Sequence, residues 1–182
     1  MENQDNIHAR LTAFGSQLID VHRRLRSELT RISDEMDDFL DGGARPPADL
    51  QAHCLAFCSA LERHHTSEEH DAFPALAGQH PGLAAVLDKL REDHRLVSGI
   101  LRRLEHLIKD LTPRARNNPR EARRLRGELD GQTAILESHF RFEERTLTDA
   151  LNTLRAPEWE ATPPAFLHIR PPAPPDTGPH TP

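Results

Sequence analysis

Residues 87–108 read LDKLREDHRLVSGILRRLEHLI, with an apolar side chain at nearly every third or fourth position. An α-helix turns by about 100° per residue, so this spacing gathers the apolar side chains on one face. The positions on that face in the wider segment are Leu83, Leu87, Leu90, Val97, Leu101, Leu104 and Ile108. His94 falls among them. The stretch therefore predicts an amphipathic helix over about 81–111 whose buried side includes an imidazole.

Three further segments, at about 7–40, 49–77 and 119–154, show the same helical periodicity, and none shows the alternation typical of a strand. Links rich in glycine, proline or asparagine separate the segments. Short links make consecutive amphipathic helices antiparallel neighbours. We therefore expect an all-α protein in which residues 1–155 form an antiparallel up-down-up-down four-helix bundle.

Residues 156–182 differ in composition, because they hold nine of the fifteen prolines and few apolar residues. Proline removes a backbone donor and clashes inside a helix. A segment with few apolar side chains cannot bury enough surface to fold. We therefore predict that this segment forms no helix, buries no core and is a Pro-rich, extended or disordered tail.

The overall composition argues against several classes of protein. Charged residues make up 29% of the chain and the net charge is −6, which argues against nucleic acid as a partner. No apolar run reaches the length of a membrane span, and the first residues lack the pattern of a signal peptide. We therefore expect a cytoplasmic protein with no membrane partner. Two cysteines, Cys54 and Cys58, are too few for a disulfide framework.

Histidine is abundant, with 12 residues in 182, and several imidazoles fall on the apolar faces of the predicted helices. In an up-down-up-down bundle, counting from the shared end puts the inward polar residues of all four segments at one level. The second segment offers two alternative pairs for this layer. The candidates are His22, then His64 with Glu68 or His65 with Glu69, then His94, and finally His139 with Glu143.

Four imidazoles and two carboxylates in one apolar layer are costly unless a partner satisfies them, and metal ions do so. Six protein ligands exceed the four that a tetrahedral zinc ion needs, and they suit two first-row metals bridged by carboxylates. Mixed imidazole and carboxylate ligands favour iron or manganese, with zinc able to substitute. The sequence therefore predicts a two-iron site that binds dioxygen or peroxide as its small ligand.

Four stretches also resemble a known family. The stretches QLIDVHRRLR (17–26), HHTSEEHDAFPAL (64–76), REDHRLV (91–97) and SHFRFEERTL (138–147) are similar to the four helices of the hemerythrin-like, or HHE cation-binding, domains. The resemblance covers about 10–154. It implies a carboxylate-bridged, non-heme diiron site in which the two glutamates are the bridges. The family pattern H, HxxxE, H, HxxxE is matched by His22, His64, Glu68, His94, His139 and Glu143.

The resemblance also favours one of the two pairs in the second segment. In the family, a Pro-x-Leu follows the ligand histidine by ten positions, and the PAL at 74–76 has that spacing from His64. His64 and Glu68 are therefore the expected ligands. His65 and Glu69 would then flank them, as candidates for handling protons beside the metals.

Position 98 departs from the oxygen-carrying hemerythrins, which have a second histidine one turn after the ligand of the third helix. Here that residue is Ser98, which joins the two flanking residues as a candidate for handling protons. The family's His-x-x-x-x-Asp is also changed, because Glu143 and Glu144 follow His139 at four and five positions. One iron is therefore expected to lose an imidazole, which argues against simple reversible oxygen carriage.

Two classes of function are compatible with such a site. In the first, the protein is an enzyme, an oxidase or a catalase-like protein, whose two irons activate dioxygen or decompose hydrogen peroxide. In the second, it is a non-enzymatic module that binds dioxygen, nitric oxide or iron for sensing or storage. Because no DNA-binding or catalytic output segment is recognisable in the sequence, we favour a stand-alone redox protein, with the binding module as the alternative.

Overall fold

The computed structural model describes residues 13–44 and 47–168. Within these ranges the chain is largely helical and contains no strand, so the predicted all-α class is confirmed. None of the helices in these ranges is both long and apolar enough to cross a membrane.

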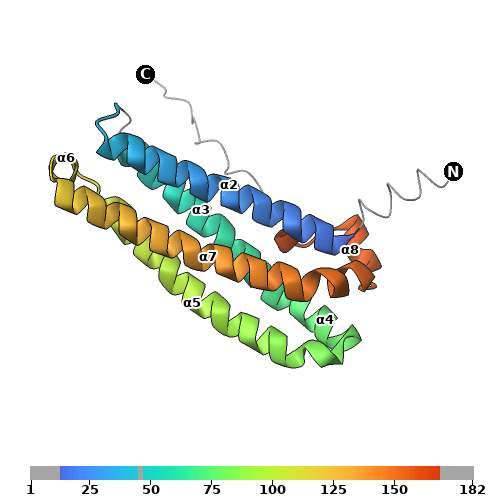
Figure 1. Cartoon of the computed structure of the whole chain (residues 1–182). Coiled ribbons are helices and arrows are strands. Elements are labelled where there is room, and N and C mark those ends of the chain that lie inside the picture. The colour runs from blue at the N-terminus through green and yellow to red at the C-terminus, as the bar shows by residue number, and fades with distance from the viewer. Residues whose placement is uncertain (1–12, 45–46, 169–182) are drawn as a thin grey trace, which may run out of the picture.

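Four long helices run side by side along the molecule, and Figure 1 shows each one running opposite to the next along the chain. Helices α2 and α5 each pack against both α3 and α7, so the four enclose a common interior. A 3₁₀ turn over Pro81–Leu83 precedes α5, and the short helix α6 (Pro113–Arg116) precedes α7. The long helices are α2 (Phe14–Leu40), α3 (Pro47–Ser67), α5 (Ala84–Lys109) and α7 (Pro119–Thr153).

Local sequence signals set the ends of these helices. Helix α7 begins at Pro119, whose fixed φ suits a first turn. The Asn118 side chain accepts hydrogen bonds from the backbone N–H groups of Arg120 and Glu121, at 3.1 and 3.3 Å. After the end of α2, Gly42 has a φ of 101°, a left-handed conformation that glycine adopts without strain. The links predicted from turn-forming residues therefore lie where helices end.

The second segment is not one continuous α-helix. Helix α3 is followed by a π-helical turn over Glu68–Ala72, and α4 then extends over Phe73–Gln79. Pro74 explains the change, because proline has no N–H to donate to the carbonyl four residues earlier and its ring clashes there. The backbone N–H of Phe73 instead donates to Glu68 O, at the five-residue spacing of a π turn. This widened turn lies directly beside the candidate site.

Apolar side chains fill the interior in two separate clusters. The larger cluster begins at Val21 and Leu25 and extends toward α6, built mostly from leucine, isoleucine and valine. The smaller cluster lies at the opposite end, where Leu18, Phe73 and Leu147 meet. His22 is buried between the two clusters. The interior therefore has a polar layer with apolar packing on both sides.

Residues 156–168 correct the prediction of a tail without helix or core. They form the short helix α8 (Pro157–Ala161) and a 3₁₀ turn over Ala165–Leu167, next to the N-terminal end of α2 (Figure 1). Trp159 and Phe166 are buried and pack edge to face, with ring centroids 5.4 Å apart. Pro157 is tolerated because it lies in the first turn of α8, and the aromatic rings supply the buried area. The rest of the predicted tail, residues 169–182, lies outside the described residues.

Candidate metal centre

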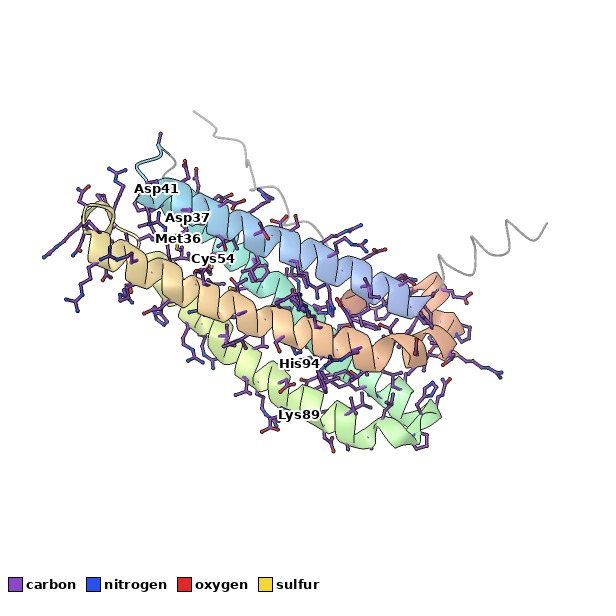
Figure 2. All side chains as sticks on the ribbon, in the orientation of Figure 1. Met36, Asp37, Asp41, Cys54, Lys89 and His94 are labelled. Carbon is purple, nitrogen blue, oxygen red and sulfur yellow. The ribbon has the colours of Figure 1, made fainter. Side chains whose placement is uncertain are left out.

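The buried polar side chains of the described chain gather in one layer of the interior. Figure 2 shows Met36 and Cys54 toward the α6 end and His94 farther along the molecule, toward α4. Each of the four long helices contributes to the layer, and the π-helical turn adds one residue. The buried polar residues are His22, His64, His65, Ser67, Glu68, His94, His139 and Glu143. The six predicted ligands are thus brought together, and their binding of metal stays a prediction.

Four of these residues form a first group whose candidate ligand atoms all lie within 4.8 Å of one another: His22, His64, Glu68 and Glu143. The Nε2 atoms of His22 and His64 are 3.0 Å apart. His64 Nε2 lies 3.1 Å from Glu68 Oε1, and His22 Nε2 lies 3.5 Å from Glu143 Oε2. Two imidazoles and two carboxylates therefore converge on one point between α2, α3 and α7.

A second group satisfies the same distance limit and shares Glu143 with the first: His65, His94, His139 and Glu143. The Nε2 atoms of His65 and His139 are 3.0 Å apart, as in the first group. Glu143 Oε2 lies 3.6 Å from His139 Nε2, and Glu143 Oε1 lies 3.8 Å from His94 Nε2. Glu68 also faces both groups, because its Oε2 lies 3.5 Å from His94 Nε2. Both glutamates therefore face both groups of histidines.

The centre of this layer contains polar atoms without hydrogen-bond partners. Both carboxylate oxygens of Glu68, both of Glu143 and the Nε2 of His94 are buried and unpartnered. Burying such groups unsatisfied costs free energy, and the cost is largest for charged ones. Cations between the two groups would satisfy all five atoms, since imidazole nitrogen and carboxylate oxygen are ordinary ligands of first-row metals. The donor set therefore fits a pair of metal ions.

A model of the hemerythrin HHE cation-binding domain matches residues 15–152. The chain belongs to the hemerythrin HHE cation-binding domain family. The match spans α2 to α7 and includes every residue of the two groups, so the resemblance found in the sequence is confirmed. No curated protein and no solved structure matches the chain. A metal cation is the ligand that membership of this family implies.

Burial controls the protonation of this hemerythrin-like site. Burial lowers the pKa of His64 to about 4, and it lowers the pKa of His139 to about 4 as well. At neutral pH these imidazoles therefore offer unprotonated nitrogens, the form that binds metal. Burial also opposes the charge on His94, but contact with Glu143 and the charge of Glu68 raise its pKa to about 9. Burial and the charge of Glu143 raise the pKa of Glu68 well above its usual range.

Three of the layer's histidines are oriented by acceptors on their outer side. His22 Nδ1 donates to Glu144 Oε1 at 3.0 Å, and His94 Nδ1 donates to Glu69 Oε1 at 2.9 Å. His64 Nδ1 donates to a backbone carbonyl in the segment after α7, that of Phe166, at 3.1 Å. A neutral histidine whose Nδ1 donates outward presents a bare Nε2 inward. His94, whose pKa is raised to about 9, would release its second proton when a metal binds. These contacts therefore orient the imidazoles for metal binding.

Sequence reasoning treated His64 and His65 as alternatives, whereas the structure brings both into the layer. His64 meets His22 of α2, and His65 meets His139 of α7. Consecutive residues point about 100° apart on a helix, so a helix facing two partners can direct one residue to each. Of the two glutamates, Glu68 faces the groups while Glu69 lies outside them. The sequence does contain an indication of this. His65 is adjacent to His64, and two other helices each carry a histidine that one member of the pair can face.

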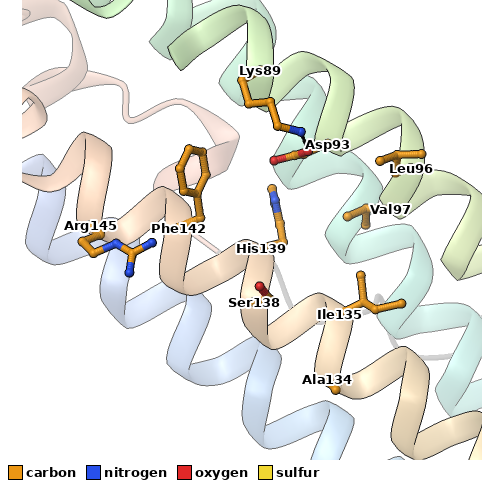
Figure 3. Close-up of a pocket in the computed structure, with 10 residues that line it drawn as sticks. All are labelled: Lys89, Asp93, Leu96, Val97, Ala134, Ile135, Ser138, His139, Phe142 and Arg145. Carbon is orange, nitrogen blue, oxygen red and sulfur yellow. Dashed lines mark hydrogen bonds and ion pairs between the residues drawn. The ribbon is translucent and has the colours of Figure 1, made fainter.

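Two cavities lead from the surface to the layer. One, of about 450 Å³, lies between α5 and α7 and reaches His139. Figure 3 shows Phe142 and Arg145 across this cavity from Lys89 and Asp93. The other, of about 330 Å³, lies on the α3 side of α5, and Ser98, Glu69 and the two histidines His65 and His94 are part of its lining. Small molecules therefore have routes to the second group from both sides of α5.

Proposed function

We propose that this hemerythrin-like domain holds two iron ions in its polar layer. His22 and His64 would bind one ion, His94 and His139 the other, with Glu68 and Glu143 as bridges. The observation that carries the proposal is the set of four unpartnered carboxylate oxygens placed between the two imidazole groups. Imidazole with carboxylate suits iron or manganese, and zinc can occupy the same ligands.

The arrangement of the helices supports this assignment. We infer that α2, α3, α5 and α7 are the antiparallel up-down-up-down bundle predicted from the sequence, with α4, α6 and α8 as short additions (Figure 1). A bundle of this kind builds metal sites in its core from side chains on facing helices. Because each long helix supplies at least one histidine to the layer, the bundle itself fixes the site's geometry.

The bound irons would supply a redox centre able to bind dioxygen or to decompose hydrogen peroxide. The chain's own residues would prepare that chemistry. The two apolar clusters exclude water above and below the layer. Glu69 and Ser98, which line the cavity beside His94, would exchange protons with an entering reactant. The size of both cavities suits a small molecule such as peroxide.

Iron analysis tests the proposal first. Protein produced with ample iron should hold close to two iron ions per chain, and His22→Ala or His139→Ala should lower that number. His53→Ala is the matched control, because His53 bonds Glu28 and Glu35 outside the layer. Unchanged iron in both layer variants, or no iron in the wild type, would overturn the assignment.

Oxygen evolution after addition of hydrogen peroxide then separates the two classes of function. Rapid oxygen evolution that disappears in the iron-poor variants supports a catalase-like enzyme. Iron-loaded protein that evolves no oxygen and turns over no dioxygen supports the alternative, a module that binds dioxygen, nitric oxide or iron without catalysis.

A further inference from the structure

We propose that His65 is a fifth imidazole ligand, bound to the same metal ion as His94 and His139. The inference rests on the proposed two-iron function and extends its ligand set to five histidines and two glutamates. His65 is 5% exposed, and its Nε2 lies 3.0 Å from His139 Nε2. Its ring stacks on that of His94, with centroids 4.0 Å apart and an interplanar angle of 8°.

The two groups contain the same kind of contact. The Nε2 atoms of His22 and His64 approach to 3.0 Å in the first group, which is also the separation of His65 and His139 in the second. A pair of imidazole nitrogens facing each other inside an apolar interior needs a proton or a cation between them. Since Glu143 Oε2 lies within 3.6 Å of both His22 and His139, a cation at either histidine pair would find a carboxylate oxygen beside it.

The position of Ser98 explains why the imidazole comes from α3. Ser98 lies one turn after His94 on α5 and lines the same cavity as His65. A serine at this position supplies no imidazole, and the His65 ring instead stacks on the His94 ring from the neighbouring helix. The substitution at position 98 therefore does not leave the second metal with one imidazole fewer.

The expected ligand sets are unequal. The ion at His22 and His64 would have two imidazoles and two bridging carboxylates, while its neighbour would have three imidazoles and the same bridges. This set differs from the sequence-based expectation, in which one iron loses an imidazole. With His65 included, imidazole outnumbers carboxylate at the second ion.

The test compares iron-loaded wild type with His65→Ala, His65→Gln and His70→Ala in the full chain. His70 is the matched control, because it lies five residues away on the π-helical turn, is exposed and donates only to the Thr66 carbonyl in the described structure. The readouts are iron per chain, the rate of iron release to an iron(II) chelator, and the number of imidazoles per iron from X-ray absorption. Circular dichroism checks that each variant is folded.

Loss of a residue that only orients a ligand costs about 10–100-fold in metal affinity, so loss of a ligand should weaken binding at least as much. We therefore expect His65→Ala and His65→Gln to release part of their iron at least about 10 times faster than wild type, with fewer imidazoles per iron. Added imidazole should slow the release from His65→Ala, and His70→Ala should match wild type. Glutamine keeps a side chain that can hydrogen bond to His139. If His65→Gln releases iron at the wild-type rate and keeps the wild-type number of imidazoles per iron, His65 is not a metal ligand. If wild type binds two irons and both His65 variants are unchanged, this inference alone fails; if wild type binds none, the proposed function fails with it.

Discussion

Replacing Glu68 by glutamine should have opposite effects on the metal-free and the iron-loaded protein. Glu68 is buried, both of its carboxylate oxygens lack hydrogen-bond partners, and it faces a second buried carboxylate, that of Glu143. Glutamine has the same shape and no charge. The Glu68→Gln variant should therefore be more stable than wild type without metal, and should hold less iron because one bridge is weakened.

Linkage between protonation and folding gives the size of the effect. Burial and the charge of Glu143 raise the pKa of Glu68 well above 4.5, so above that pH the folded chain keeps a proton that the unfolded chain releases. The contribution of Glu68 to the stability of the folded, metal-free chain is complete below pH 4.5 and is lost as the pH rises. Each pH unit in this window costs wild type up to about 1.4 kcal/mol of unfolding free energy. In a chain of this size, 1 kcal/mol corresponds to about 2–4 °C in Tm.

Urea unfolding of the metal-free proteins at several pH values above 4.5 measures the difference directly. The advantage of Glu68→Gln over wild type should grow with pH, and the iron content of the loaded variant should fall. Glu62→Gln, an exposed change on α3, should show neither effect. A stability difference that stays constant or shrinks as the pH rises would refute the reasoning, as would a Glu68→Gln variant with full iron content.

Three further predictions follow from the same structure. Glu143→Gln should lower iron per chain by more than half, because both groups share this carboxylate; elemental analysis checks it. In the metal-free protein, the lowered pKa of His64 and His139 should cost about 3 kcal/mol of stability per histidine as the pH falls from 6.5 to about 4, since the unfolded chain takes up protons that the folded chain does not. The difference in unfolding free energy between wild type and His139→Gln, measured by urea titration at each pH, should give the contribution of His139 alone. Phe166→Ala should cost about 3–5 kcal/mol in thermal or urea unfolding, whereas the exposed Thr162→Ala should change stability by less than about 0.5 kcal/mol.

Periodicity predicted the helices and the level of the layer because both depend on regular geometry. His22 and His94 lie within long, uninterrupted apolar stripes, so their burial followed from position along a helix. Counting from a shared end placed them at one height, because the rise per residue is nearly constant. Periodicity offered His64 and His65 as alternatives because it assigns one inward direction to a helix, and α3 here faces two partners.

Local exceptions account for the other differences between the predicted and the observed helices. Pro74 converts part of the second helix into a π turn, and a helical wheel assumes that no such turn occurs. The prolines after residue 155 predicted a segment without helix or core. Trp159 and Phe166 nevertheless supply the burial that orders α8 and the turn after it. Proline is tolerated in the first turn of a helix, so a high number of prolines does not by itself exclude a short helix.

The contact between His64 and the Phe166 carbonyl joins positions 102 residues apart in the chain. Phe166 also donates its backbone N–H to the Ser67 hydroxyl at 3.0 Å, so this residue forms two hydrogen bonds with α3. A ribosome must therefore deliver nearly the whole described chain before His64 takes its final orientation. A nascent chain that stops soon after α7 would carry all the proposed ligands, with His64 lacking the carbonyl that orients it.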